Sequence, residues 1–158
     1  MTESDLTNTL QDLLRNLQTS TPGILGAGII SADGFAIASE LPHSVEENRV
    51  AAMAAAMLAL GEQTTIEFEH GGLRHVFIEG ETGTTIIMSA GTDAVLSAVA
   101  RKDAKLGLVF LQMERAASYP AVHKALKENR LELHGWLFDL HGPLVYSYDP
   151  KSGQFEAA

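Results

Sequence analysis

Residues 44–69, SVEENRVAAMAAAMLALGEQTTIEFE, decide how the rest of the chain folds. Residues 50–60 run without a charge, and most of them are alanine. Alanine, leucine and methionine are strong helix formers, so the stretch predicts one long helix. The uncharged run is about half of the roughly 20 residues that cross a bilayer. Charged residues also bound it on both sides. We therefore expect a buried helix and no membrane span.

A helix that is apolar nearly all round has to be covered on more than one side. In one interpretation, other parts of the same chain cover it within a monomer. In the other, a sheet covers one side and a second copy of the chain covers another. We favour the second interpretation, because soluble monomers rarely leave a long apolar stripe exposed. The expected assembly is a twofold symmetric homodimer with Met53 and Met57 near the contact.

The segment before this helix predicts a helix and a hairpin. Five leucines, at positions 6, 10, 13, 14 and 17, form one apolar stripe and predict a helix over residues 4–18. Residues 24–31 and 35–40 are expected strands, joined through Asp33 and Gly34, a pair typical of tight turns. Gly26 and Gly28 leave little side chain on one strand, so we expect the alanine-rich helix to pack closely there.

Caps and glycine turns predict the boundaries of the elements that follow. Ser44 is an expected N-cap of the long helix, with Glu47 as its capping-box partner, and Gly71 and Gly72 follow its expected end near residue 69. Strands are expected over residues 74–79, 84–90 and 94–100. Asp103 is expected to cap a last helix over residues 106–117. The predicted order is helix, two strands, helix, three strands, helix.

Composition excludes several classes of protein. The chain has 158 residues, 46% of them hydrophobic, and no cysteine, which excludes disulfides and thiolate metal ligands. Its acidic start, MTESDLTNTL, is no signal peptide, so we expect a cytoplasmic protein. Residues 1–100 carry three basic and thirteen acidic side chains, a net charge of −10, which argues against nucleic-acid binding. Residues 101–130 carry a net charge of +4, expected on the solvated side of a helix.

No motif of catalysis or cofactor binding stands out. The six histidines form no pair at i, i+4 spacing, and no HExxH occurs. The sequence has no GxGxxG, no GxxxxGK[ST] and no GxSxG. We therefore expect no catalytic residue, no metal ligand and no cofactor, and a protein that is not an enzyme. A small-ligand sensor is a weaker alternative, since helix-and-sheet domains of this size can enclose a pocket.

Three motifs carry a family resemblance: PGILGAGIISADGFAIAS at residues 22–39, ENRVAAMAAAMLALGE at 47–62 and DAVLSAVARKDAKLGLVFLQMERAA at 93–117. Residues 6–118 resemble a roadblock domain, a small dimeric domain associated with regulators of Ras-like GTPases and with dynein light chains. The resemblance implies a five-stranded antiparallel sheet, with the central helix on one face and the terminal helices on the other. It also implies that two copies join sheet edges through residues 74–79 and pair their central helices.

The function that the resemblance implies is a homodimeric adaptor or regulator that binds a small Ras-like GTPase through the paired central helices. Arg49 has two interpretations: a finger that stabilises the transition state of GTP hydrolysis, or a surface residue paired with Glu46 one turn away. We favour the ion pair. The residues expected at the partner and dimer interface are Glu46, Arg49, Val50, Met53, Ala56, Met57, Leu60, Arg74, Val76 and Ile78.

Residues 119–158 differ in character from residues 1–118, and we expect them to form a separate extension of the roadblock-like domain. Pro120 suits the start of a helix up to residue 129, and residues 131–140 and 144–148 predict a hairpin. This extension resembles the C-terminal end of bacterial β-carbonic anhydrases, without the cysteines of their zinc site. The alternative function is therefore an accessory or scaffold subunit for a carbonic anhydrase. Because the extension is rich in aromatic residues and leucine, we expect it to be ordered and docked.

Overall fold

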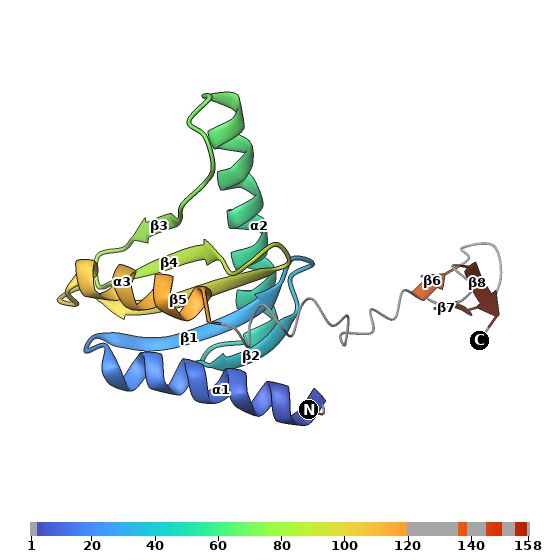
Figure 1. Cartoon of the computed structure of the whole chain (residues 1–158), viewed down its shortest axis with the longest axis horizontal. Coiled ribbons are helices and arrows are strands. Elements are labelled where there is room, and N and C mark those ends of the chain that lie inside the picture. The colour runs from blue at the N-terminus through green and yellow to red at the C-terminus, as the bar shows by residue number, and fades with distance from the viewer. Residues whose placement is uncertain (1–2, 120–135, 139–144, 150–153, 158) are drawn as a thin grey trace. The chain divides into compact units, whose positions relative to one another are not determined.

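The computed structural model describes residues 3–119, 136–138, 145–149 and 154–157. By their contacts, the residues divide into two compact units, Met1–Glu128 and Asn129–Ala158. The first unit has the predicted order of elements (Figure 1). Its elements are α1 (Glu3–Ser20), β1 (Ile24–Ser31), β2 (Ala36–Glu40), α2 (Glu47–Glu67), β3 (Val76–Glu79), β4 (Gly83–Ser89), β5 (Ala94–Arg101) and α3 (Leu106–Ala117).

The five strands form one antiparallel sheet in the order β2-β1-β5-β4-β3. The short strands β2 and β3 are its edges. One row of paired residues crosses four strands, from Ala27 through Ala98 and Ile86 to Phe77. The predicted fold class, a mixed α/β fold with a five-stranded antiparallel sheet, is confirmed.

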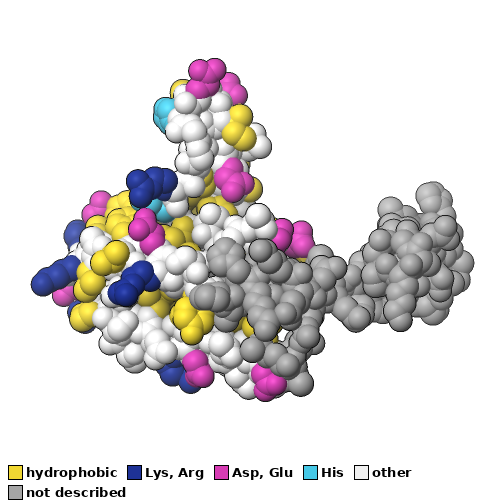
Figure 2. All heavy atoms as spheres, in the orientation of Figure 1, with side chains coloured by type: hydrophobic (Ala, Val, Ile, Leu, Met, Phe, Trp, Pro, Cys, Tyr) yellow, Lys and Arg dark blue, Asp and Glu magenta, His cyan; other side chains and the backbone are white. Residues whose placement is uncertain are grey.

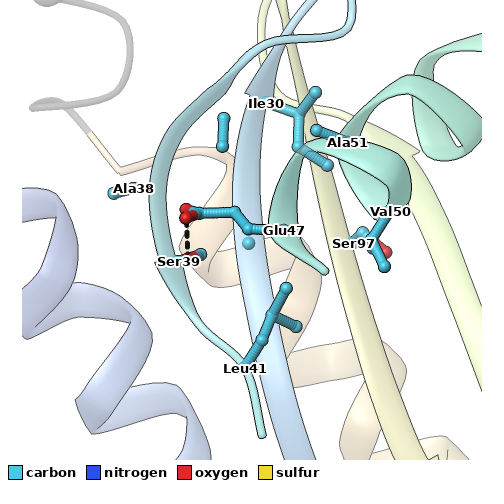
Figure 3. Close-up of a pocket in the computed structure, with 10 residues that line it drawn as sticks. Ile30, Ala38, Ser39, Leu41, Glu47, Val50, Ala51 and Ser97 are labelled. Atoms are coloured by element: carbon cyan, nitrogen blue, oxygen red, sulfur yellow. Dashed lines mark hydrogen bonds between the residues drawn. The ribbon is translucent and has the colours of Figure 1, made fainter. Parts of the chain in front are cut away.

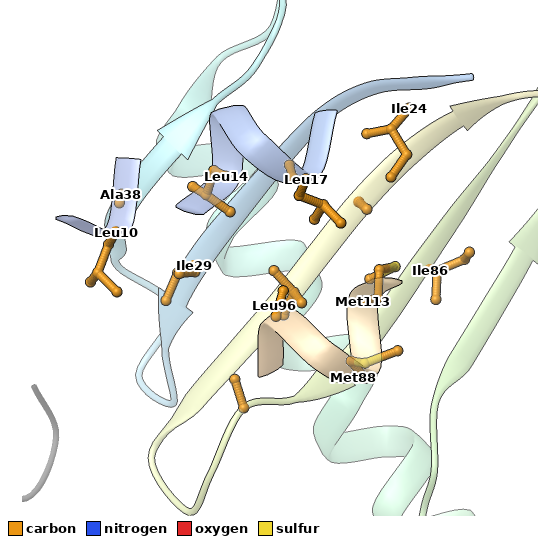
Figure 4. Packing of buried hydrophobic residues seen from close by; sticks show 14 of the residues in the cluster. Leu10, Leu14, Leu17, Ile24, Ile29, Ala38, Ile86, Met88, Leu96 and Met113 are labelled. Atoms are coloured by element: carbon orange, nitrogen blue, oxygen red, sulfur yellow. The ribbon is translucent and has the colours of Figure 1, made fainter. Parts of the chain in front are cut away.

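Helices cover both faces of the sheet, because successive strand residues point to opposite sides. On one face α1 and α3 enclose the larger core cluster, which includes Ile29 and Ile86 (Figure 4). On the other face α2 packs on the neighbouring residues Ile30 and Ile87. Figure 1 shows that α2 runs across the strands and that its second half extends past the edge strand β3. The expectation of a central helix on one face and the terminal helices on the other is confirmed.

Both predicted helix N-caps are wrong. The N-cap of α2 is Glu46, whose carboxylate accepts hydrogen bonds from the backbone N–H groups of Asn48 and Arg49 at 3.1 and 2.9 Å. Ser44 lies inside a turn, closed by the bond from Val45 N to Pro42 O, and is therefore not directly before the helix.

Asp103, the predicted N-cap of α3, does not cap that helix either. The N-cap of α3 is Lys105, which makes no side-chain capping bond. Asp103 instead accepts a hydrogen bond from Arg101 Nε at 3.1 Å. The Asp103 carboxylate, predicted to cap α3, therefore forms an ion pair with Arg101 at the end of β5 instead.

Helix α2 was expected to pack closely at Gly26 and Gly28, but the glycine that it approaches is Gly34. A Cβ atom at Gly26 would lie 2.8 Å from Glu40 O, so its crowded neighbour is the end of β2. Gly28 has only ordinary contacts to β2 within 4 Å. At Gly34, whose φ is +88°, a Cβ atom would lie 3.2 Å from Ala52 Cα. Of the three glycines, the one closest to the alanine-rich helix is therefore Gly34 in the turn between β1 and β2, whereas β1 meets the helix through Ile30.

The second unit contains a small sheet of its own. β6 (Trp136–Phe138), β7 (Val145–Asp149) and β8 (Gln154–Ala157) form an antiparallel sheet in the order β6-β7-β8. The pairing of β6 with β7 agrees with the predicted hairpin, of whose first strand only Trp136–Phe138 is described. Strand β8 was not predicted. The helix expected over residues 119–129 lies, apart from Tyr119, outside the described residues. The domain boundary after residue 118 and the docking of the extension remain predictions.

Candidate interaction surface

Within the part of the chain that the structure describes, few residues of helix α2 are buried. Its buried residues are Ala51, Ala54 and Leu58, which face the sheet. No residue of α2 after Leu58 is buried. Leu60 and Ile66 are each 67% exposed. The second half of α2 therefore leaves two large apolar side chains, Leu60 and Ile66, exposed among otherwise mostly polar residues.

One flank of α2, which we call the seam side, consists of Val50, Met53, Met57 and Leu60. At 100° per residue, these four side chains lie within a narrow sector of the helix. Gly61 lies between this sector and the sheet, and a Cβ atom there would be 2.8 Å from Val76 Cγ2 of β3. The seam side therefore faces the region above the edge strand β3.

The opposite flank, which we call the hairpin side, consists of Ala52, Ala55, Ala59 and Ile66. Its small residues lie close to the turn between β1 and β2, because a Cβ atom at Gly34 of that turn would be 3.2 Å from Ala52 Cα and 3.7 Å from Ala55 Cβ. The next residue of the turn, Phe35, is 65% exposed. The sequence predicted the Asp-Gly turn before Phe35, but it held no signal that Gly34 of this turn lies against α2.

The edge strand β3 is open and apolar. Among the described residues it pairs with β4 alone, and both Phe77 and Ile78 are exposed. Val76 packs with the core cluster under α2. On the other face of the sheet, Phe77 lies 6.1 Å from the ring of Phe110 in α3. An open edge with exposed apolar side chains can pair with a strand of another chain.

The charged residues of the predicted site divide into two places. Glu46 and Arg49 lie at the start of α2, where Glu46 serves as the cap. The ion pair expected between them is absent from the part of the chain that the structure describes, because the Glu46 carboxylate binds backbone N–H groups. Arg74 lies apart and approaches Glu114 of α3 at 3.6 Å. Of the ten predicted interface residues, nine therefore belong to α2, its cap or β3, and Arg74 lies just before β3, turned toward α3.

A small pocket of about 10 Å³ lies between α2 and the β1–β2 hairpin (Figure 3). Glu47 of α2 and Ser39 of β2 are hydrogen-bonded beside it. A cavity of this size holds roughly one water molecule. It therefore gives no support to the small-ligand sensor.

A shallow groove of about 150 Å³ lies between α1 and α3, on the other face of the sheet.

Figure 2 shows lysine and arginine side chains gathered away from the projecting end of α2, and acidic side chains on that end. Among the described residues, no three histidine, aspartate or glutamate side chains lie together as metal ligands would. Within the same ranges, no helix is long and apolar enough to span a membrane.

Known proteins share both the sequence and the fold of the first unit. Residues 10–100 match the Roadblock/LC7 domain family. The uncharacterized protein MJ0310 of Methanocaldococcus jannaschii is 40% identical over 97 residues, which cover 61% of this chain and 84% of the relative. The uncharacterized protein MJ0714 of the same organism is 37% identical over 117 residues, covering 74% and 94% of the two chains.

Solved structures agree in fold. The Roadblock/LC7 domain from Streptomyces avermitilis superposes with a TM-score of 0.68 at 22% identity, covering 74% of this chain and 97% of the other. MglB of Myxococcus xanthus gives a TM-score of 0.68 at 16% identity, covering 76% and 96%. A short stretch of 47 residues is also 34% identical to carbonic anhydrase 1 of Escherichia coli O157:H7, but it covers only 30% of this chain and 22% of the enzyme.

Proposed function

The chain belongs to the Roadblock/LC7 domain family, and on that premise we propose that it is a homodimeric regulator that binds a small Ras-like GTPase without catalysing a reaction itself. The observation that carries the proposal is the uncovered apolar surface of α2 beside the open edge of β3. Open strand edges and exposed apolar surfaces both favour association, and a second copy would cover the two at once.

The geometry of β3 supports pairing between two copies. A twofold axis through the middle of β3, at Phe77 or Ile78, lies one or two residues from Val76, which contacts α2 at Gly61. At about 3.4 Å per residue, α2 would lie about 3 to 7 Å from the axis. Two copies of the helix would then be about 7 to 14 Å apart, a range that includes the usual 8 to 10 Å of packed helices. The seam side would face the second copy.

Light scattering tests the dimer. Met57→Glu adds a charge to the seam side and should convert the dimer to the monomer mass at micromolar concentration. Leu111→Glu is the matched control, because Leu111 is 52% exposed on α3, on the other face of the sheet. This control should leave the dimer mass unchanged. If the wild-type protein has the monomer mass at micromolar concentration, the proposed homodimer is wrong.

The partner class follows from the family. Roadblock domains are associated with regulators of Ras-like GTPases, and the chain has no phosphate-binding motif that would make it the GTPase itself. The test is titration calorimetry of the dimer against each small Ras-like GTPase of its native organism, loaded with GDP or with a GTP analogue that resists hydrolysis. If none binds at tens of micromolar in either state, the regulator proposal falls.

Arg49 is the residue to test for a catalytic contribution to the partner's reaction. Its guanidinium forms no ion pair within the described residues, so it is available to a partner. A finger arginine raises GTP hydrolysis by about 10³ to 10⁵. The turnover of the bound GTPase with wild-type protein and with Arg49→Ala would show whether this chain supplies one.

The second candidate function is an accessory subunit for a carbonic anhydrase. The short stretch of identity to carbonic anhydrase 1 favours it. A pull-down from the native organism separates the two candidates, because the regulator should capture a small GTPase and the accessory subunit an anhydrase.

A further inference from the structure

The hydrogen bonds of strand β3 limit how a second copy can pair with it. Gly80, directly after β3, donates its backbone N–H to Gly83 O at 2.8 Å. In an antiparallel ladder, hydrogen-bonded pairs alternate with pairs that are not hydrogen-bonded. The backbone groups of the even-numbered residues of β3 therefore point toward β4, as those of Gly80 do. The backbone groups of Phe77 and Glu79 point outward, to the open edge.

This alternation allows two positions for a twofold axis near the middle of β3. Outward-pointing residues have to meet outward-pointing residues, so the axis passes through Phe77 or through Ile78, and not between them. With the axis at Phe77, the two copies of Phe77 face each other, and His75 faces Glu79 of the second copy. With the axis at Ile78, Phe77 faces Glu79 of the second copy, and His75 faces Glu81.

The side chains on one face of β3 favour the axis at Phe77. His75 and Phe77 lie on the same face of the sheet, because their rings lie 4.5 and 6.1 Å from the ring of Phe110 in α3. Glu79 shares this face, since every second residue of a strand does. An aromatic pair across two strands stabilises a sheet, and an imidazole N–H can donate a hydrogen bond to a carboxylate. The other axis would place the ring of Phe77 against the charge of Glu79.

The face of β3 that lies toward α2 favours the same axis. Val76 belongs to the residues packed in the core cluster under α2, and Ile78 is 39% exposed. With the axis at Phe77, Val76 faces Ile78 of the second copy, so that two apolar side chains meet. With the axis at Ile78, Val76 would face Gly80, which has no side chain to pack.

The two ends of the edge also differ in charge. Arg74 and His75 precede β3, and Glu79 and Glu81 lie at its end. Arg74 approaches Glu114 of its own chain at 3.6 Å, and its side chain is still 82% exposed. Two copies that pair antiparallel bring the basic end of one edge to the acidic end of the other. The edge is therefore complementary to itself.

We infer that the twofold axis of the homodimer passes through Phe77, and that His75 and Glu79 select this register as a pair formed twice across the axis. This inference rests on the proposed homodimer. It adds the residues that align the two copies and that distinguish a second copy from an unrelated strand.

A single cysteine tests the position of the axis, because the chain has no cysteine of its own. In full-length Phe77→Cys, the two Cα atoms should be about 5.5 Å apart, within the usual range of a disulfide. Oxidised glutathione should therefore give a covalent dimer on a gel without reductant. Ile78→Cys is the matched control, because its two Cα atoms would be about 8 Å apart, too far for a disulfide.

Charge exchange tests the pair across the axis. Glu79→Lys and His75→Glu should each raise the dissociation constant of the dimer about fivefold to thirtyfold, since the pair occurs twice. The double variant, His75→Glu with Glu79→Lys, restores opposite charges and should dissociate at least about fivefold less readily than His75→Glu. Both proteins lack the contact of His75 with Phe110, so their difference isolates the pair. Sedimentation equilibrium measures these constants.

The outcomes keep this inference apart from the proposed function. If the wild-type protein has the dimer mass but Phe77→Cys is not crosslinked faster than Ile78→Cys, the axis is wrong and the homodimer stands. A wild-type protein of monomer mass would remove both. A double variant that dissociates as readily as His75→Glu would show that the pair does not select the register, and would overturn that part of the inference.

Discussion

Glu46 shows what a single side chain contributes to the fold. Its carboxylate binds two backbone N–H groups at the start of α2 that would otherwise lack a partner. We expect Glu46→Ala to lower the free energy of unfolding by about 0.5 to 2 kcal/mol, the usual cost of losing an N-cap. Urea unfolding at fixed protein concentration measures the change. Ser44→Ala is the matched control and should change stability by less than about 0.5 kcal/mol. A larger loss of stability in Ser44→Ala than in Glu46→Ala would show that Ser44 is the N-cap, as the sequence predicts.

Gly34 shows a second residue-scale constraint, at the contact between the β1–β2 turn and α2. Its φ is +88°, and a Cβ atom would lie 3.2 Å from Ala52 Cα. Gly34→Ala should therefore destabilise the protein by more than about 1 kcal/mol. Gly72→Ala is the control, because nothing lies within 4 Å of its Cβ position. Thermal unfolding should give a clearly lower melting temperature for Gly34→Ala only. Equal temperatures would mean that the turn adjusts freely against α2.

At the scale of elements, the sequence predicted those helices and strands that a local pattern of residues specifies. Leucine spacing predicted α1, and glycine turns separated the five strands of the sheet. The caps could not be predicted, because Ser44 and Asp103 are favoured by local preference, whereas a turn and an ion pair decide their actual roles. The two flanks of α2 could not be told apart either. An alanine-rich helix has no polar face to orient it, so only tertiary contacts at Gly34 and Gly61 distinguish them.

The second half of α2 should be ordered by the second copy. In a single copy no residue after Leu58 is buried, and short uncovered helices are marginal in water. In Met57→Glu, we therefore expect the amides of residues 59–67 to exchange hydrogen much faster than in the wild-type dimer. The amides of α3 serve as the internal control and should change little. Equal protection of residues 59–67 in monomer and dimer would show that α2 needs no partner to be stable.

For the molecule as a whole, the first unit contains the residues expected to be sufficient for folding, dimerisation and binding. Among the described residues, every member of both core clusters lies between Leu6 and Ala117. We therefore expect residues 1–118 alone to fold, to keep the dimer mass and to bind the GTPase. We also expect lower solubility than for the full chain, since the sequence predicts that the extension covers apolar surface. Light scattering, thermal unfolding and the concentration at which each form precipitates measure these properties.

Limited proteolysis of the full chain tests the same prediction from the other side. A docked extension should resist cleavage, because proteases act on exposed, locally unfolded segments. Rapid cleavage near residue 129 that leaves a stable core of the first unit would contradict docking, while the fold and the dimer would stand. A truncated protein that is unfolded or monomeric would mean that residues beyond 118 complete the first unit. The extension would then be part of the regulator itself, and an anhydrase partner would no longer be needed to explain it.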